Sequence, residues 1–262
     1  MSEVTLRVMS YNIRYDNPGD GPNAWPHRKE SVANLIQFYQ PDLFGLQEVL
    51  HGQLVYLEET LKGYERIGVG RDDGKQAGEF SPILYSPEKL ELLDSGTFWL
   101  SETPDRPSVG WDASLERIAT WGQFRYRASG DTLFFYTTHF DHRGEQARQE
   151  SARLLLRKIN EQAEGHPVIV TGDFNSNPRS VPYQLLTQGE GLRDALEISE
   201  LPSVGPHRSF SGFAVTDSLP GDRIDYIFVS PTWTVRRHAI IASFSEGRFP
   251  SDHLPVVADV VW

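Results

Sequence analysis

The sequence of 262 residues contains no cysteine, which excludes disulfide bonds and thiolate metal sites. It also lacks an apolar run approaching the roughly 20 residues that a membrane-spanning helix needs. At the N-terminus no basic segment leads into an apolar stretch, so the pattern of a secretory signal peptide is missing. We therefore expect a cytoplasmic protein without a membrane span. Nothing in the sequence predicts an oligomeric state.

Positive charge is also scarce. Lys and Arg number 25 against 36 Asp and Glu, which gives a net charge of −11. A protein that holds duplex DNA through many phosphate contacts is usually basic, so a nucleic acid partner is possible but not favoured. A local basic patch or a bound metal would still allow one. The acidic excess suits a site in which carboxylates hold a divalent cation.

The order of apolar segments predicts one mixed α/β domain spanning residues 1–262, because no linker, repeat or low-complexity tract interrupts it. Apolar residues at positions i, i+3, i+4 and i+7 predict a helix at 28–39. Further helices are expected at 51–61, 144–163 and 181–186. Strands are expected at 5–9, 42–49, 64–69, 82–85, 90–100, 120–127, 132–139, 168–170, 224–229, 234–241 and 254–261.

Residues 167–178, PVIVTGDFNSNP, join a short apolar strand to a polar loop. Asp173 and Asn175 follow the strand with one residue between them, and alternation along an extended chain places both side chains on one face. Asp173 is able to accept a proton, and Asn175 offers an amide donor and a carbonyl acceptor. An Asx turn that closes the strand explains the same residues equally well.

Polar residues end several other predicted strands. Taken singly, each has an ordinary explanation as a helix cap, a turn residue or a hydrogen-bonded core histidine. Asp225 lies inside the apolar segment RIDYIF, where a charge is costly without a partner, and a histidine is the natural partner. The full set is Asn12, Glu48, His139, Asp173, Asn175, Asp225, Asp252 and His253.

These residue types fit metal-assisted hydrolysis of a phosphate ester. Oxygen ligands without cysteine or an HExxH pair favour Mg²⁺ or Mn²⁺ over zinc. Such an ion offsets the repulsion between an anionic ester and the attacking water. A carboxylate then acts as the base, and a protonated histidine stabilises the charge that develops.

Six motifs run in order along nearly the whole chain: SYNIR at 10–14, PDLFGLQEV at 41–49, TTHFD at 137–141, GDFNSNP at 172–178, RIDYIF at 223–228 and SDHLPVV at 251–257. In these motifs the chain resembles the endonuclease/exonuclease/phosphatase superfamily, which includes DNase I. The resemblance implies a four-layer α/β sandwich, in which two mixed β-sheets pack face to face with helices outside.

The resemblance also implies roles for the metal-side residues. Glu48 corresponds to the principal metal carboxylate, with Asn12 beside it and Asp252 contributing. Asp173 corresponds to the residue that orients or deprotonates the attacking water. Asn175 corresponds to the residue that helps to place that water and the phosphate.

Two histidines complete the implied site. His253, paired with Asp225, corresponds to the group that stabilises charge on the phosphoryl oxygens, and His139 to a second phosphate contact. Arg14 departs from the abasic-site endonucleases, which have an aspartate there, and matches DNase I. Abasic-site activity is therefore less expected, and the number of metal ions stays open.

Other residues are candidates for the substrate-binding wall. Arg117 is able to clamp a phosphate with two hydrogen bonds, or to pair with an acidic neighbour on the surface. His142 follows the strand that ends at His139 and is a second candidate for substrate contact. Three tryptophans offer stacking surfaces for a base or sugar, or pack in the core and loops: Trp25, Trp111 and Trp121.

The sequence thus predicts a Mg²⁺- or Mn²⁺-dependent phosphoesterase. Hydrolysis of a phosphodiester comes first, a phosphomonoester second, and net acidity favours a small or soluble phosphorylated substrate. A nuclease acting on DNA or RNA is the first alternative. The second is a binding module that kept the fold and lost the chemistry.

Overall fold

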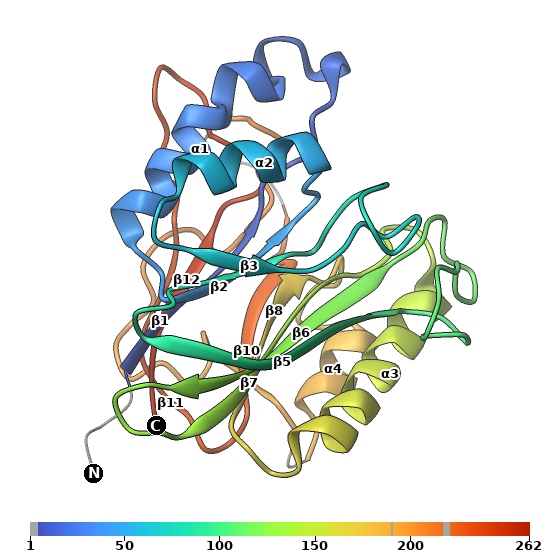
Figure 1. The fold of residues 1–262 in the computed structure, drawn as a ribbon. Helices are drawn as coiled ribbons and strands as arrows, with labels where there is room; N and C mark the ends of the chain where they lie inside the picture. Colours follow the sequence, from blue (N-terminus) through green and yellow to red (C-terminus); the bar gives the residue numbers. More distant parts are fainter. Residues whose placement is uncertain (1–4, 190, 217–220) are drawn as a thin grey trace.

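The computed structural model describes residues 5–189, 191–216 and 221–262, and it is built in four layers (Figure 1). Two six-stranded β-sheets pack together in the middle, and helices cover the outer face of each. The α/β sandwich with two mixed sheets predicted from the sequence is confirmed. In the part of the chain that the structure describes, no helix is both long and apolar enough to cross a bilayer.

The first sheet has the strand order β11-β12-β1-β2-β4-β3. Its centre is the parallel pair β1 (Thr5–Asn12) and β2 (Leu43–Gln47), so both strands end at the same edge. The remaining neighbours are antiparallel. The other strands are β3 (Glu65–Ile67), β4 (Ile83–Tyr85), β11 (Thr234–Ile240) and β12 (Val256–Val261).

The second sheet has the order β5-β6-β7-β8-β10-β9. Here the parallel pair is β7 (Thr132–His139) and β8 (Val168–Asp173), and the long helix α3 (Glu145–Ala163) connects them. The other strands are β5 (Leu90–Trp99), β6 (Ile118–Tyr126), β9 (Arg193–Asp194) and β10 (Asp225–Val229). The two-residue strand β9 was not predicted, because so short a segment has no periodicity to detect.

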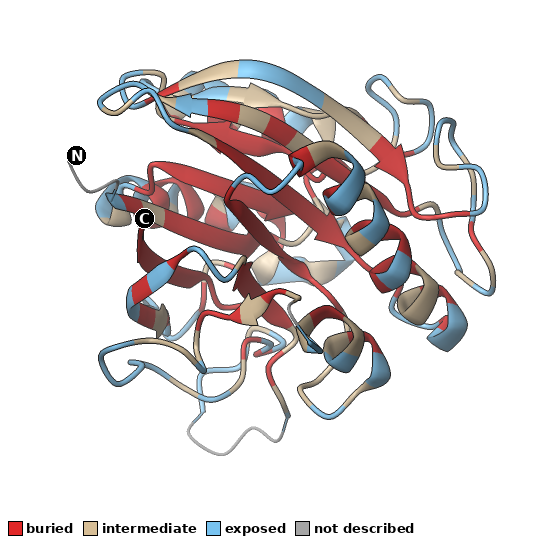
Figure 2. Cartoon of the chain, turned by 90° about the horizontal axis from the view of Figure 1, so that it is seen from below, coloured by how far each residue is buried: buried red, intermediate tan, exposed pale blue. Residues whose placement is uncertain are grey.

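Each helix buries one face against a sheet (Figure 2). Helices α1 (Trp25–Tyr39) and α2 (His51–Thr60) cover the first sheet, and α3 with α4 (Val181–Thr187) covers the second. Helix α1 begins at Trp25, three residues before the predicted start, because Pro26 is compatible with a first helical turn. A short 3₁₀ helix, η1 (Pro18–Asn23), lies in the predicted loop before it.

The two sheets approach closely next to the ends of their parallel strands. A Cβ on Gly45 of β2 would lie 2.1 Å from Oγ1 of Thr137 on β7, so only glycine fits there. Gln47, two residues further along β2, donates a hydrogen bond from Nε2 to Oγ1 of Thr137 at 3.0 Å. These contacts fix the spacing between the sheets at the edge where the polar residues gather.

Candidate active site

The polar residues predicted to act together gather where β1, β2, β7 and β8 end. His139 is paired with Asp173 in the parallel ladder of β7 and β8, and Asp173 is paired with Asp225 in the antiparallel ladder of β8 and β10. Paired residues in adjacent strands have Cα atoms about 5 Å apart, so three chemistry-bearing side chains lie in one row. Asn12 ends β1 on the facing sheet.

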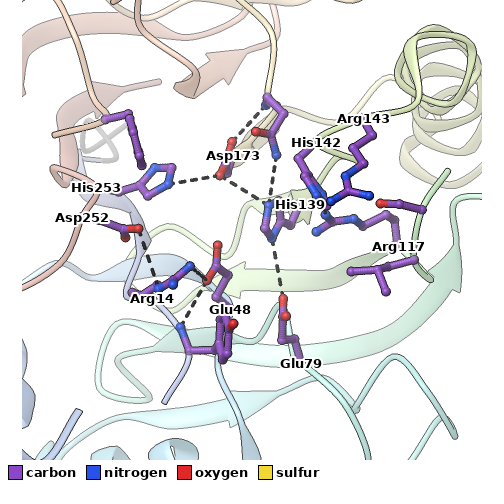
Figure 3. A pocket seen from close by; sticks show the side chains of 15 residues that line it. Arg14, Glu48, Glu79, Arg117, His139, His142, Arg143, Asp173, Asp252 and His253 are labelled. Atoms are coloured by element: carbon purple, nitrogen blue, oxygen red, sulfur yellow. Dashed lines mark hydrogen bonds and ion pairs between the residues drawn. The ribbon is translucent and has the colours of Figure 1, made fainter. Parts of the chain in front are cut away.

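A cavity of about 590 Å³ opens at this edge, and residues from both sheets line it (Figure 3). Of the predicted site residues, Asn12 and Asp225 are buried directly behind the lining, and all the others reach the cavity. The lining consists of Arg14, Tyr15, Glu48, Glu79, Ser114, Leu115, Arg117, His139, His142, Arg143, Asp173, Asn175, Phe210, Asp252 and His253.

Asp173 is at the centre of the hydrogen-bond network. Its Oδ2 accepts a hydrogen bond from Nδ2 of Asn12 at 3.0 Å and lies 3.4 Å from Nε2 of His139 and 3.7 Å from Nε2 of His253. Burial, followed by the negative charge of Asp225, raises the pKa of the Asp173 carboxyl to about 7. A carboxylate with that pKa is suited to accept a proton near neutral pH.

His253 forms a buried pair with Asp225. Nδ1 of His253 and Oδ2 of Asp225 are 2.9 Å apart. Burial disfavours the charged ring, but the charges of Asp225 and Asp173 and this hydrogen bond outweigh it and raise the pKa of His253 well above its usual value. The ring is therefore protonated near neutral pH, and its Nε2–H faces Asp173. The predicted pairing of Asp225 with a histidine is present in the structure.

A group of carboxylates beside this pair fits a divalent cation. Glu48, Asp173 and His253 offer ligand atoms that all lie within 4.8 Å of one another. Because His253 is protonated, the two carboxylates are the better ligands for a hard ion. Asp252 lies next to them, and burial and the charge of Glu48 raise the pKa of its carboxyl. Carboxylates crowded in this way repel one another unless a cation lies between them.

Asn12 and Arg14 bridge these carboxylates. Nδ2 of Asn12 donates to Oε1 of Glu48 and to Oδ2 of Asp173, both at 3.0 Å, while its Oδ1 accepts from the backbone N–H of Arg14. The amide nitrogen of Asn12, and not its oxygen, therefore faces the candidate metal position. Arg14 lies 3.9 Å from Glu48 and 3.8 Å from Asp252, and it is held by Asp20.

Backbone conformation differs from the sequence-based expectation at Asn175. Strand β8 ends at Asp173, and Asn175 has a left-handed backbone with φ of 46°, so alternation along an extended chain does not place its side chain. Its N–H donates to Oδ1 of Asp173 at 2.9 Å, which is an Asx turn. Its side chain still reaches Nε2 of His139 at 3.1 Å. Glu48 also has a left-handed backbone, with φ of 60°, and such strain often marks a functional site.

His139 is neutral and its tautomer follows from its neighbours. Burial, and then the charges of Arg117 and Arg71, lower the pKa of His139 well below its usual value. Nδ2 of Asn175 donates to Nε2 of His139, which leaves the proton on Nδ1. That Nδ1 is buried, lacks a hydrogen-bond partner among the described residues, and lies 3.9 Å from Oε2 of Glu79.

The far wall of the cavity contains residues that the sequence analysis missed. Glu79 lies in the segment before β4, and its carboxylate accepts two hydrogen bonds from the guanidinium of the buried Arg71, at 2.8 and 3.0 Å. Burial raises the pKa of Glu79, although Arg71 opposes the shift. The only available signal was the glycine-rich, charged character of residues 70–78, which indicates a loop and not a site.

Arg117 and His142 lie beside each other on the same wall. Arg117 is 4% exposed; its Nε donates to Oδ2 of Asp141 at 3.4 Å, and its Nη2 contacts Nδ1 of His142 at 2.9 Å. Arg117 therefore has an acidic partner, as predicted, but the pair is buried and not on the surface. Arg117 nevertheless lines the cavity together with His142.

The three candidate tryptophans lie away from the cavity lining. Trp25 packs edge-on against Tyr56 between α1 and α2, and Trp121 stacks on Phe134 of the second sheet. Trp111 packs against the core cluster beneath α3. These contacts support the core and loop-packing interpretation over base or sugar stacking.

The chain is similar to known proteins over nearly its whole length. The family model described as "Endonuclease/Exonuclease/phosphatase family" matches residues 9–253. A solved endonuclease/exonuclease/phosphatase family protein from Bacteroides thetaiotaomicron has a TM-score of 0.96 and 39% identity, covering 100% of this chain and 99% of that chain. A solved mannosyl-6-phosphatase from Bacteroides thetaiotaomicron has a TM-score of 0.93 and 40% identity, with 98% and 100% covered.

A more distant relative acts on nucleic acid according to its name. Human tyrosyl-DNA phosphodiesterase 2 is 25% identical over 257 residues, which is 92% of this chain but 65% of that protein. The match of the family model over nearly the whole chain, together with the two bacterial structures, shows the family. The chain belongs to the endonuclease/exonuclease/phosphatase family of phosphoesterases.

Proposed function

We propose that this protein is a Mg²⁺- or Mn²⁺-dependent phosphomonoesterase that removes the phosphate group from a phosphorylated sugar. The observation that carries the proposal is the cavity of about 590 Å³, which has the size of a small-molecule site. One side of it contains the hydrolytic cluster of Glu48, Asp173 and His253, and the other side is a polar wall that contains Glu79, Arg117 and His142. The sugar comes from the bacterial neighbour named mannosyl-6-phosphatase, which is 40% identical and matches over nearly all of both chains.

A phosphomonoester suits the charges around the cavity. Its phosphate carries between about 1.5 and 2 negative charges near pH 7, so it needs positive groups on more than one side. His253 and Arg14 provide positive charge at the cluster, and Glu48 offers a carboxylate for a divalent ion. From the sequence a diester ranked first; the cavity and the sugar-phosphatase neighbour favour a monoester.

The donor set supports a resident metal ion. Glu48 would hold it, while Asp173 beside it remains free to accept a proton, and Asp252 lines the same cavity. When bound, the ion neutralises charge on the phosphoryl oxygens. Asn12 contributes by holding Glu48 and Asp173 together through two hydrogen bonds from one amide nitrogen.

The side chains then divide the reaction between them. The oxygen of a water forms the new bond to phosphorus, and Asp173 takes a proton from that water. The bond from phosphorus to the sugar oxygen breaks, and the sugar oxygen leaves with the bonding electrons and takes up a proton from solvent water to become the alcohol. His253 donates Nε2–H to the phosphoryl oxygens, where negative charge develops, and Asp225 keeps it protonated and oriented. Asn175 and neutral His139 lie on the opposite side of Asp173, where the N–H of Asn175 donates to Asp173 and its side chain holds the imidazole ring in place.

The test is release of inorganic phosphate from mannose 6-phosphate in the presence of Mg²⁺, Mn²⁺ or EDTA. Bis(p-nitrophenyl) phosphate and supercoiled plasmid are run in parallel, with Asp173→Asn as the matched inactive control. We expect metal-dependent phosphate release from the sugar phosphate, slow cleavage of the diester and intact plasmid. Plasmid nicking at the same enzyme concentration would favour the nuclease, which the distant relationship to tyrosyl-DNA phosphodiesterase 2 keeps as the alternative.

A further inference from the structure

We propose that Glu79, Arg117 and His142 form a subsite that binds the hydroxyl groups of the sugar ring next to the hydrolytic cluster. This inference rests on the proposed function and assigns the part of the cavity that selects the substrate. It goes beyond phosphate hydrolysis, because none of these three residues is needed to attack phosphorus. Their arrangement matches what a ring with several hydroxyl groups requires.

Two hydrogen-bond donors of this wall are available to a ligand. Arg117 lines the cavity, and among the described residues its Nη2, which carries two protons, uses one of them, in the contact with Nδ1 of His142. Nη1 of Arg117 is buried away from the cavity surface and is not a donor for a ligand. Nη2 of Arg117 donates to Nδ1 of His142, which leaves the proton of His142 on Nε2, at the exposed rim of the cavity.

Glu79 supplies the acceptor. Arg71 holds its carboxylate with two hydrogen bonds, which fixes its orientation and uses part of its accepting capacity. Oε2 of Glu79 lies 3.9 Å from Nδ1 of His139, too far for a hydrogen bond, so this oxygen keeps a lone pair free beside the cavity. Figure 3 shows Glu79 on the side of His139 away from Asp173, and Arg117 next to His142 on the same wall of the cavity.

The buried charges of this wall are compensated within it, although Arg143 also lines the cavity. Arg71 is paired with Glu79, and Arg117 with Asp141. A second phosphate or carboxylate would have to approach the carboxylate of Glu79. A hydroxyl group both donates and accepts, so it can bond to Glu79 and to Arg117 or His142 at once.

The subsite also lies at the right place relative to the reacting phosphate. Asp173 is 3.4 Å from Nε2 of His139, and Glu79 is 3.9 Å from Nδ1 of the same ring. The hydrolytic carboxylate and the sugar-binding carboxylate are therefore separated by a single imidazole ring. In a sugar that carries its phosphate on an exocyclic carbon, the phosphate and the ring hydroxyls are far enough apart to lie on opposite sides of the imidazole ring of His139.

The test asks which hydroxyl groups of the substrate interact with which side chains of the wall. The kcat/KM values are measured with Mn²⁺ for mannose 6-phosphate, each of its monodeoxy analogues and p-nitrophenyl phosphate. The variants are Glu79→Gln and His142→Gln, with Glu59→Gln on the exposed face of α2 as the matched control. For the wild type we expect at least one deoxy analogue to lose roughly ten- to hundred-fold in kcat/KM, since a wall group is left unpaired.

In Glu79→Gln or His142→Gln, the penalty for the same missing hydroxyl is expected to shrink at least several-fold. Glu59→Gln should keep the penalty of the wild type. If Glu79→Gln lowered kcat/KM equally for every substrate, p-nitrophenyl phosphate included, the subsite would be overturned. Glu79 would then act only through His139. A wild type that shows no penalty for any missing hydroxyl would overturn it as well.

A binding measurement separates this inference from the proposed function. Mannose 6-phosphate is titrated calorimetrically into the wild type and both variants in EDTA. If the wild type releases no phosphate but binds the sugar phosphate, and each variant weakens binding at least ten-fold, the subsite stands and the proposed activity fails. If the wild type neither hydrolyses nor binds it, both fail.

Discussion

The buried pair of His253 and Asp225 makes the sharpest prediction about chemistry. In Asp225→Asn the amide still accepts or donates a hydrogen bond at Nδ1, which lies 2.9 Å from the present carboxylate, but the negative charge is removed. A hydrogen bond involving a charged group contributes about 1.5–3 kcal/mol, and one pKa unit corresponds to about 1.4 kcal/mol. The pKa of His253 should therefore fall by roughly 1–2 units, while Asp173 continues to support the charged ring from 3.7 Å.

The assay is the dependence of kcat/KM on pH, measured by phosphate release between pH 6 and 10. The useful form of His253 is the protonated one, and its folded pKa lies above the ordinary value, so activity is retained below that pKa and lost as pH rises through it. The alkaline limb of Asp225→Asn should therefore move down by roughly 1–2 pH units, and the activity that remains should be highest at the acidic end.

Asp259→Asn is the matched control for this experiment. Asp259 is also a buried carboxylate in an ion pair, with Arg7, but it is not part of the cavity lining. This variant should keep the alkaline limb of the wild type even if it loses stability. An alkaline limb that stays unchanged in Asp225→Asn would refute the claim that Asp225 maintains the charge of His253.

Three further outcomes follow from the same structure. Asp173→Asn should lower kcat by roughly 10²–10⁴ while circular dichroism shows a native fold, because the proton acceptor is lost; near-normal kcat would contradict its role. Glu48→Gln should need a higher Mn²⁺ concentration for half-maximal activity and regain part of its rate in excess Mn²⁺; an unchanged metal requirement would remove Glu48 from the ligands. Burial lowers the pKa of His238 to about 4. Between about pH 6.5 and pH 4 this histidine is therefore protonated in the unfolded chain but neutral in the folded protein, and the free energy of unfolding falls as pH drops through that range. Urea unfolding should show this loss, up to about 3 kcal/mol, in the wild type, and His238→Gln should flatten it; equal slopes would contradict the argument.

Much of this site was predictable because strand ends can be located from sequence. The apolar run at 168–170 located β8, although the strand continues to Asp173, and a polar residue that follows such a run emerges at the edge of the sheet. Asp173 and Glu48 were found in this way, and Asp225 was found because a charge inside an apolar strand requires a partner. The family motifs then supplied the roles.

Other features depend on contacts that no local pattern encodes. Glu79 belongs to a loop, and its place beside His139 is set by Arg71 and by the packing of that loop against the second sheet. Asn175 was predicted for the wrong reason, because its left-handed backbone ends the alternation of the strand. The Asx turn itself brings the side chain of Asn175 to His139. The segment is therefore both a turn that closes the strand and a part of the site.

Arg14 links the charge pattern of the site to the number of metal ions it holds. A guanidinium stays protonated at any working pH, and the hydrogen bond to Asp20 together with the nearby carboxylates raises the pKa of Arg14 further. It lies within 4 Å of both Glu48 and Asp252, on the side of Glu48 away from Asp173. A second divalent ion between Glu48 and Asp252 would have to approach this permanent charge at close range, where the repulsion is strong. Arg14 therefore supplies positive charge to that pair of carboxylates, and we expect a single metal ion, held by Glu48 on the side that faces Asp173.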